Sequence, residues 1–265
     1  MKESKPASLL PNVVILTSGL SGSSVLAGLL GKAGYWLGHE TKKIGYDTYE
    51  NSELVDLNRR VLHDSGFFHE DAGDLPPPSI PRIAALAEGG RLEVYRRFLQ
   101  KCSENAPWVW KDPRLCYTMF FWNRIHDFSS SRFIFATRDS RQAWTGLVLR
   151  GRVNMAWEDY LRIERNDEDA AQRFLRKHSI HAHSVAFEDL ILQPEEVIEG
   201  LNNFLGTSIT MADFRNIYRG SLGSLRWSRT DFVRARLKVT IAARVLRRGV
   251  TFPQTDSTFM SQSKR

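Results

Sequence analysis

A glycine- and serine-rich loop is the first segment of this chain whose residue types suit chemistry. It follows a short apolar run at 12–17 and consists of Ser18, Gly19, Leu20, Ser21, Gly22, Ser23 and Ser24. Glycines let the backbone turn tightly and approach a ligand closely. Amides at the start of a helix have no partner within that helix and lie at the positive end of its dipole. With the serine hydroxyls, these amides form a cradle for a phosphate group.

The loop also excludes one common class of phosphate site. A Walker A loop has a lysine directly after its last glycine, whereas Ser23 follows Gly22 here. This difference counts against an ATPase, a GTPase or an ordinary kinase. An ordinary tight turn between strand and helix is the alternative interpretation of the loop.

Lys111 and Asp112 form a second candidate group, directly after a strand-like run at 108–110. A lysine there can bind a transferring anionic group, and an aspartate can accept a proton as a general base. The alternative is an ion pair between the two side chains that only orders the turn at Pro113.

Two polar segments, 39–43 and 47–51, supply further candidates. His39 and Glu50 are candidate bases, while Lys42 and Lys43 are candidate cations. For any single one of these residues, a solvated loop is the competing interpretation.

These residues must be positioned by alternating strands and helices. Apolar runs predict strands at 12–17, 108–110, 132–137 and 182–187. Helical spacing predicts helices at 25–33, 53–62, 91–102, 117–125, 142–149 and 194–205. This alternation predicts a three-layer α/β fold with a central parallel sheet flanked by helices. Three consecutive prolines at 76–78 predict that the segment 71–81 is a loop.

Composition and charge restrict the function classes. We expect a flexible N-terminus at 1–11, one α/β domain at 12–250 and a disordered tail at 251–265. No apolar run reaches the ~20 residues of a membrane span, and the N-terminus has no secretory signal, so we expect a cytoplasmic protein. The net charge of +7 comes partly from basic residues at 215–248, for which a solvated face is favoured over a nucleic-acid partner. The histidine and cysteine spacings predict neither a metal site nor a disulfide framework.

Four segments, in this order, resemble segments of the sulfotransferases that use 3′-phosphoadenosine 5′-phosphosulfate (PAPS). The first is the loop followed by Leu26, Leu29 and Leu30. The others are 110–114 (WKDPR), 133–139 (FIFATRD), and 187–190 (FEDL) with Pro194 and 204–206 (FLG). The resemblance runs from Val13 to Gly206 and includes the predicted strands and helices.

The resemblance implies transfer of a sulfuryl group from PAPS to a hydroxyl or amine of a small-molecule acceptor, without a metal. It implies that the loop 18–24 binds the 5′-phosphosulfate and that Arg138 binds the 3′-phosphate. Gly146 stands where the family has a serine, so Thr145 or Arg150 would have to replace that contact. Arg219 and Gly220 resemble the start of a glycine-containing loop that closes over the 3′-phosphate.

One departure from the family affects the chemistry directly. Leu20 stands where most members have a lysine or arginine that neutralises the leaving phosphate. Lys111 is our candidate substitute. Three alternatives follow: a catalytically degenerate nucleotide-binding member, a P-loop kinase for a small metabolite, and a nucleic-acid-binding protein. The acceptor and the oligomeric state are left open.

Overall fold

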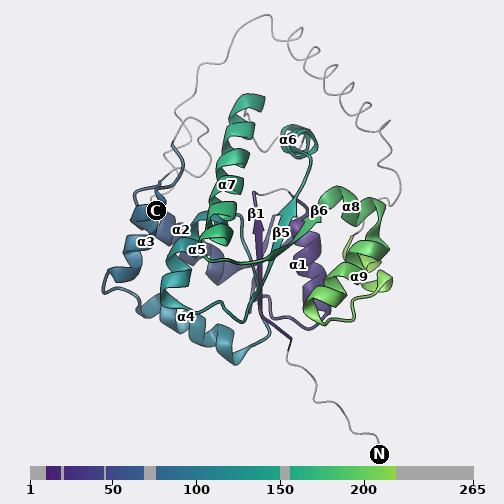
Figure 1. Ribbon diagram of the computed structural model, residues 1–265, viewed down its shortest axis with the longest axis horizontal. Helices are drawn as coiled ribbons and strands as arrows, with labels where there is room; N and C mark the ends of the chain where they lie inside the picture. Colours follow the sequence, from purple (N-terminus) through teal and green to yellow (C-terminus); the bar gives the residue numbers. More distant parts are fainter. Residues whose placement is uncertain (1–9, 19–20, 45, 69–75, 150–155, 219–265) are drawn as a thin grey trace, which may run out of the picture. The chain divides into compact units, whose positions relative to one another are not determined.

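Four short apolar runs pair as a parallel sheet in the computed structural model (Figure 1). The strand order is β4-β1-β5-β6. All five residues of β1 are buried, which explains why this run is apolar along its whole length. The strands are β1 (Val13–Thr17), β4 (Val109–Lys111), β5 (Arg132–Thr137) and β6 (Ala182–Ala186).

The structure describes residues 10–18, 21–44, 46–68, 76–149 and 156–218. All of these belong to one unit of the chain, Met1–Gly223. The predicted domain end at 250 and the predicted tail at 251–265 lie outside the described residues, and so does most of the predicted N-terminal segment.

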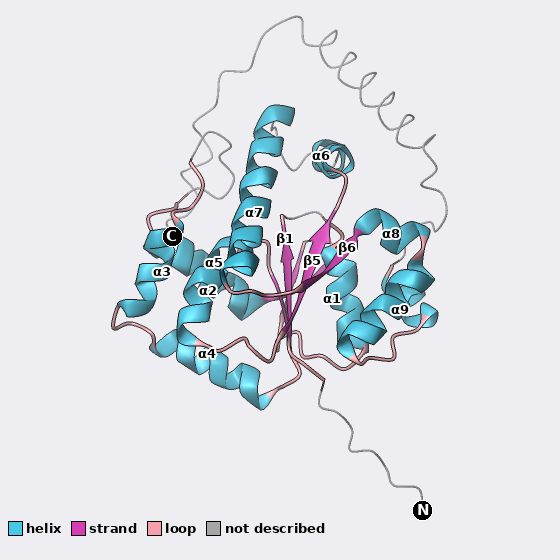
Figure 2. Ribbon diagram, in the orientation of Figure 1, coloured by secondary structure: helices cyan, strands magenta, loops and turns pink. Residues whose placement is uncertain are grey.

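Helices cover both faces of the sheet, as Figures 1 and 2 show, so the predicted three-layer α/β class is confirmed. On one face lie α1 (Ser23–Lys32), α8 (Phe187–Leu192) and α9 (Pro194–Leu205). On the other lie α2 (Ser52–Asp64), α4 (Glu93–Glu104) and α5 (Leu115–Ile125). The remaining helices are α3 (Ile80–Ala85), the 3₁₀ helix η1 (Leu86–Glu88), α6 (Ser140–Leu149), α7 (Trp157–Lys177) and α10 (Met211–Ile217).

A two-stranded antiparallel hairpin forms a second, separate sheet and was not predicted. It consists of β2 (Thr41–Lys43) and β3 (Asp47–Asn51). The side chain of Asn51 ends the hairpin by accepting hydrogen bonds from the amides of Glu53 and Leu54, at 3.0 and 3.3 Å. This cap satisfies amides at the start of α2, so the hairpin is joined directly to that helix.

Aromatic side chains fill the core between the sheet and the helices on the α2–α5 face. Trp108, Trp110 and Trp122 are almost completely buried. The rings of Trp110 and Trp122 meet edge to face with centroids 5.0 Å apart, an arrangement that favours aromatic pairs. This packing holds β4 and α5 together and thereby fixes the position of Lys111, the last residue of β4.

At two places the structure has a helix where the sequence predicted a loop or a strand. The predicted loop 71–81 gives way to α3 at Ile80, and Pro81 lies in the first turn of that helix, where a missing amide hydrogen costs nothing. The strand predicted at 182–187 ends at Ala186, and Phe187 begins α8.

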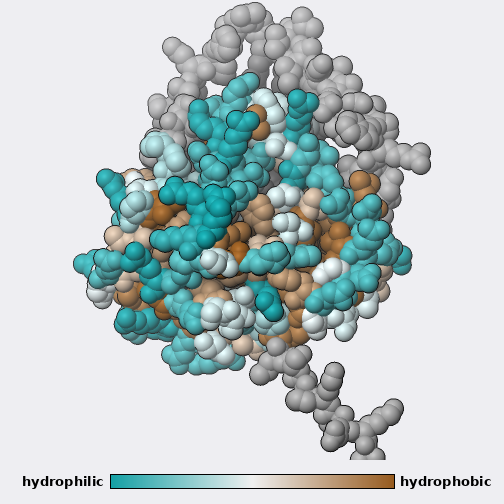
Figure 3. Space-filling model, in the orientation of Figure 1, coloured by the Kyte–Doolittle hydropathy of each residue, from teal (hydrophilic) through white to brown (hydrophobic). Residues whose placement is uncertain are grey.

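The helix α7 is amphipathic, and hydrophilic side chains cover the part of it that Figure 3 shows. Its buried positions include Tyr160, Glu164 and Phe174. No helix among the described residues is long and apolar enough to span a membrane.

Candidate functional site

The four parallel strands end at one edge of the sheet, and the segments after them form the candidate site. In the register of the sheet, Thr17 pairs with Ala136, and Thr137 pairs with Ala186. The residues that follow these strand ends therefore lie close together. Ligands of open α/β sheets bind outside this carboxyl edge.

The described part of the predicted phosphate loop is tightly constrained. Thr17 and Ser21 are buried, and their hydroxyl groups hydrogen-bond to each other. Gly22 begins α1 as its N-cap with φ of 74°, a left-handed conformation that favours glycine. Ser18 and Ser24 are partly exposed and Ser23 is buried. Of the predicted loop, Gly19 and Leu20 lie outside the described residues.

Phe187 connects this loop to Arg138. A Cβ atom added to Gly22 would lie 1.9 Å from Cδ2 of Phe187, so the ring packs directly against the glycine backbone. The Arg138 guanidinium lies over the same ring, 4.5 Å from its centroid. This cation–π contact stabilises the arginine next to the loop. Segments after β1, β5 and β6 thus meet at one aromatic ring.

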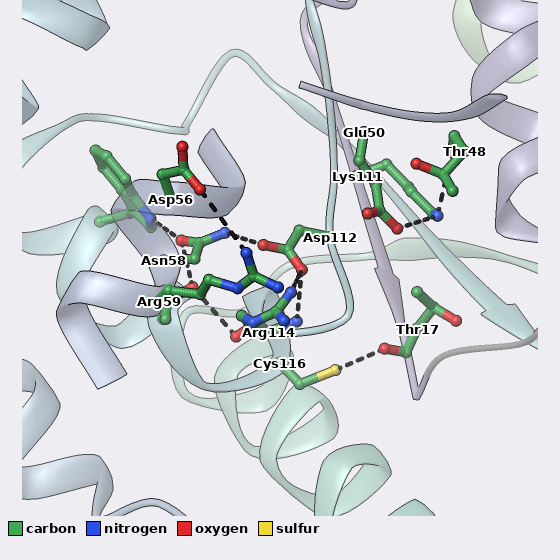
Figure 4. Close-up of polar contacts among 12 residues, drawn as sticks. Thr17, Thr48, Glu50, Asp56, Asn58, Arg59, Lys111, Asp112, Arg114 and Cys116 are labelled. Atoms are coloured by element: carbon green, nitrogen blue, oxygen red, sulfur yellow. Dashed lines mark hydrogen bonds and ion pairs between the residues drawn. The ribbon is translucent and has the colours of Figure 1, made fainter. Parts of the chain in front are cut away.

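Lys111 joins the sheet, the hairpin and α1. Its side chain is 5% exposed, and its ammonium donates to Oε1 of Glu50 at 2.7 Å (Figure 4). The same ammonium donates to Oγ of Ser24 at 3.3 Å and to the carbonyl oxygen of Thr48 at 3.4 Å. The structure therefore brings together three predicted site residues, Lys111, Glu50 and Ser24. It places a buried cation next to the first turn of α1.

Asp112 does not take the predicted position of a general base. Its side chain is completely buried. One oxygen accepts a hydrogen bond from the Asn58 amide at 2.8 Å, and the other accepts from the backbone and guanidinium of Arg114 at 3.2 and 2.9 Å. Because protein donors bind both oxygens, Asp112 positions Arg114 and orders the turn. It also does not pair with Lys111, so the ion pair considered from sequence is replaced by Lys111–Glu50 and Asp112–Arg114.

Asn58 completes the support of this turn (Figure 4). Its side-chain oxygen accepts hydrogen bonds from the Thr118 hydroxyl at 2.9 Å and the Trp122 indole at 2.8 Å, while its amide nitrogen donates to Asp112. One buried amide therefore links α2 to the β4–α5 turn and to α5. Sequence spacing gave no indication of this contact, since Asn58 and Asp112 are 54 positions apart.

Burial changes the acidity of several groups at this edge. It raises the pKa of the Asp112 carboxyl, and the nearby Arg114 guanidinium opposes that rise. Burial also raises the pKa of Cys116 well above its usual range, so this thiol stays protonated. The Cys116 thiol contacts the carbonyl oxygen of Thr17 at 3.1 Å and connects α5 to the end of β1. The two cysteines are free, as the sequence predicted.

Other predicted site residues lie elsewhere. His39 is exposed and its ring meets that of Trp36, whose backbone bridges to Trp108 before β4 begins. It is therefore near the opposite end of β4 from Lys111, and the structure does not bring it into the group. Gly146 lies in α6 with open space around it. The predicted contacts Arg150, Arg219 and Gly220 lie outside the described residues.

The helix α7 was not predicted from the sequence, and it carries buried polar side chains. The hydroxyl of Tyr160 donates to Oε1 of Glu164 at 2.9 Å, and both residues are buried. The charge of Arg138 influences the Tyr160 hydroxyl. The spacing of Tyr160, Glu164 and Asp167 places them on one helix face, which is the signal that could have identified them.

The arrangement is suited to binding an anion. Lys111 lies at α1, Arg138 lies on the ring that contacts the loop, and the α1 amides lie at a helix start. No group of three histidine, cysteine, aspartate or glutamate side chains in the described parts of the chain is placed to hold a metal ion.

Comparisons with known proteins place solved sulfotransferases among the structures similar to this chain. No family model matches the sequence, and no curated protein matches it. A sulfotransferase domain from the curacin biosynthetic pathway is 18% identical, with a TM-score of 0.48, over 81% of this chain and 80% of that chain. A sulfotransferase from Mycobacterium avium is 17% identical, with a TM-score of 0.48, over 90% of this chain and 77% of that chain. The sulfotransferase domain of the Synechococcus PCC 7002 olefin synthase is 18% identical, with a TM-score of 0.45, over 85% of this chain and 84% of that chain.

Proposed function

We propose that this chain is a sulfotransferase that moves a sulfuryl group from PAPS to a hydroxyl or amine of a small-molecule acceptor. PAPS carries a phosphosulfate at one end and a 3′-phosphate at the other, so its site needs two separate groups that bind anions. The loop with the start of α1 is one such group, and Arg138, directly after β5, is the other. Arginine suits a phosphate because its planar guanidinium can donate two parallel hydrogen bonds.

One observation carries the proposal: the Lys111 ammonium is buried within 3.3 Å of Ser24 Oγ. The loop has no lysine of its own after Gly22, and Leu20 replaces the usual cation. A sulfuryl transfer leaves negative charge on the departing phosphate oxygen, which a fixed cation in a water-poor site stabilises strongly. Lys111 reaches the loop from the neighbouring strand and can supply that charge.

The residues then have distinct roles. The loop amides and the hydroxyls of Ser23 and Ser24 bind the phosphosulfate end, and Arg138 binds the 3′-phosphate. Lys111 neutralises the leaving oxygen. The acceptor oxygen or nitrogen bonds to sulfur while the bond from sulfur to the phosphate oxygen breaks, and the leaving electron pair stays on the phosphate. The protein thus acts chiefly by positioning groups and balancing charge.

Nucleotide binding is the first test. We expect 3′,5′-adenosine bisphosphate, the product of PAPS, to raise the unfolding temperature more than ATP with magnesium does. At 100 times its Kd, a ligand stabilises the folded state by about 2.7 kcal/mol. Stabilisation by ATP with magnesium alone would reject PAPS as the donor and favour a small-molecule kinase.

Turnover is the second test, and the chain offers a matched control. The double variant Lys111→Met with Glu50→Gln removes the buried ion pair without leaving a buried charge. Lys101→Met with Glu53→Gln removes a more exposed pair, whose atoms are 2.9 Å apart. We expect the first variant to lose about 100-fold or more in sulfuryl transfer from labelled PAPS, as loss of a transition-state donor does. Equal activity in the two variants would remove Lys111 from the mechanism.

A nucleotide-binding protein without turnover is the second candidate. The observation that favours it is the ion pair itself, because Glu50 lies 2.7 Å from the Lys111 ammonium and offsets its charge. Binding of 3′,5′-adenosine bisphosphate without transfer from PAPS to a panel of phenols, alcohols and amines would establish this alternative.

A further inference from the structure

The proposed transfer needs a proton acceptor as well as a cation. The acceptor hydroxyl or amine loses a proton as it bonds to sulfur, and a nearby base accelerates that step. Asp112 does not serve, because protein donors bind both of its oxygens. A second carboxylate, that of Glu50, lies 2.7 Å from the Lys111 ammonium and therefore directly at the proposed cation.

The two oxygens of the Glu50 carboxylate have different surroundings. The side chain is 9% exposed, and Oε1 accepts the hydrogen bond from the Lys111 ammonium (Figure 4). Within the described part of the chain, no other group donates a hydrogen bond to this carboxylate. Oε2 keeps contact with solvent, since it is not one of the fully buried atoms that lack a partner there. One oxygen therefore fixes the group, while the other can accept a proton from a ligand.

The Lys111 ammonium also ties this carboxylate to the loop. It donates to Oγ of Ser24 at 3.3 Å, and Ser24 lies in the first turn of α1. The strand β3, which ends next to Glu50 at Asn51, contacts both α1 and β4. The carboxylate and the start of α1 are thus hydrogen-bonded to the same cation.

The backbone at Tyr49 turns two groups toward that cation. Tyr49 has φ of 54°, a left-handed conformation that is strained for a residue other than glycine. The residue before it, Thr48, offers its carbonyl oxygen to Lys111 at 3.4 Å, and the residue after it is Glu50. The Tyr49 ring packs on α1, where a Cβ added to Gly28 would lie 2.9 Å from Cε2 of the ring. Strained residues that the surrounding structure holds in place cluster at functional sites.

We propose that Glu50 is the general base of the sulfuryl transfer and that it acts as one unit with Lys111. This inference rests on the proposed function. As the acceptor's oxygen or nitrogen bonds to sulfur, its proton passes to Oε2 of Glu50. The bond from sulfur to the phosphate oxygen breaks, and its electron pair leaves on that oxygen. The products are the sulfated acceptor, 3′,5′-adenosine bisphosphate and protonated Glu50, which returns the proton to solvent.

The proton transfer also increases the effect of the Lys111 charge. In the resting pair the Glu50 carboxylate, 2.7 Å away, offsets the charge of the ammonium. The carboxylate becomes neutral when it takes the proton, so the full charge of the ammonium then acts on the phosphate oxygen while negative charge develops there. The pair therefore stabilises the transition state more than the bound substrate, which is what raises kcat.

The first experiment uses Glu50→Gln, which keeps an oxygen for the Lys111 ammonium but takes no proton from the acceptor. We expect kcat for transfer from PAPS to aliphatic alcohols to fall about 100-fold or more, the usual contribution of a general base. Transfer to nitrophenols, which are largely ionised in neutral buffer, should change less than about tenfold because these acceptors need no base. Glu53→Gln makes the same charge change in the more exposed pair with Lys101 and is the matched control, with wild-type kcat expected.

Nucleotide binding provides a readout that needs no turnover. Glu50→Gln removes a negative charge next to the cation at the loop, so its affinity for 3′,5′-adenosine bisphosphate should be about tenfold higher than that of the wild type. Tighter binding together with slower transfer to alcohols is the signature of the base. Tighter binding with equal or faster transfer would show that Glu50 only offsets the Lys111 charge. Weaker binding would show that Glu50 only holds the lysine in place, and either result overturns the inference.

A double-mutant cycle tests whether the two residues act as one unit. Lys111→Met and Glu50→Gln should each lower kcat for an alcohol about 100-fold, and the double variant should lose about the same factor. Losses that multiply to about 10,000-fold would show two independent groups and overturn the coupling. If a single variant does not fold, the double variant, which buries no unpaired charge, decides alone. Equal losses for alcohols and nitrophenols would then overturn the base assignment.

The outcomes separate the inference from the proposed function. If the wild type transfers the sulfuryl group and Glu50→Gln keeps its rate with alcohols, the base assignment is overturned and the proposed function stands. If the wild type transfers nothing from PAPS to any acceptor, both are overturned.

Discussion

Replacing Gly22 by alanine tests the packing of the Phe187 ring, where the segments that follow β1, β5 and β6 meet. The added Cβ would lie 1.9 Å from Cδ2 of Phe187, well inside van der Waals contact. The residue also has φ of 74°, which an alanine adopts at a cost of about 1–2 kcal/mol. Pushing the Phe187 ring away adds about 1–3 kcal/mol, the usual cost of overpacking. We therefore expect Gly22→Ala to lower the free energy of unfolding by about 2–5 kcal/mol.

A double-mutant cycle separates the two contributions. In a Phe187→Ala background the ring is absent, so Gly22→Ala should cost only the about 1–2 kcal/mol of the left-handed backbone. The coupling between the two positions should therefore be about 1–3 kcal/mol. Denaturant unfolding of the four proteins at one pH measures it, and unchanged m-values show that the comparison is valid. Titration with 3′,5′-adenosine bisphosphate measures separately how much nucleotide affinity is lost when the loop is changed.

Gly146→Ala is the control for this experiment. Gly146 lies within α6, and nothing lies within 4 Å of an added Cβ. Alanine in a helix interior is favoured over glycine by about 1 kcal/mol, so this variant should be stabilised. If Gly22→Ala costs the same with and without the Phe187 ring, the packing argument is refuted. A cost below that of the left-handed backbone alone would refute the assigned conformation as well.

Three further predictions follow from the same edge of the sheet. Arg138→Ala should weaken 3′,5′-adenosine bisphosphate binding by about 1.5–3 kcal/mol, the value of a charge-assisted hydrogen bond, and calorimetry measures it. Asn58→Ala should destabilise the fold by about 2–4 kcal/mol because it leaves buried donors and the Asp112 carboxylate without their partner, which denaturant unfolding tests. Asp167 has a raised pKa in the folded state, so its contribution to stability is present below pH 4 and is lost as the pH rises through about 7. Asp167→Asn should remove that loss, and its unfolding temperature should exceed that of the wild type increasingly from pH 4 to pH 8.

Local sequence patterns predicted the elements that build the sheet and its first helices. The run at 12–17 is apolar because β1 is buried on both sides, and α1 and α9 carry apolar residues at helical spacing. Gly206 ends α9 in the left-handed conformation that a glycine after a helix indicates. These features depend on residues that are close together in the sequence, so they can be predicted from the sequence alone.

Features that depend on distant partners could not be predicted in this way. The hairpin strands β2 and β3 are short and polar, without the alternation that marks a strand. The Lys111–Glu50 pair joins positions 61 apart, and nothing near either residue indicates the other. Asp112 was predicted as a base because its type suits that role, but burial and the Asn58 amide decide its actual role.

The number of hydrogens on the Lys111 ammonium limits how a ligand can bind to it. An ammonium group carries three, and three oxygens surround this one: those of Glu50, Ser24 and Thr48. Each of the three hydrogens already has an acceptor, so a ligand oxygen can bind the ammonium only by displacing one of these three oxygens. The contacts to Ser24 and Thr48 are the longest, and these are the ones an exchange releases first. Binding at this lysine therefore exchanges a long hydrogen bond to a neutral oxygen for a charge-assisted bond to the ligand, so the number of hydrogen bonds made by the ammonium stays the same.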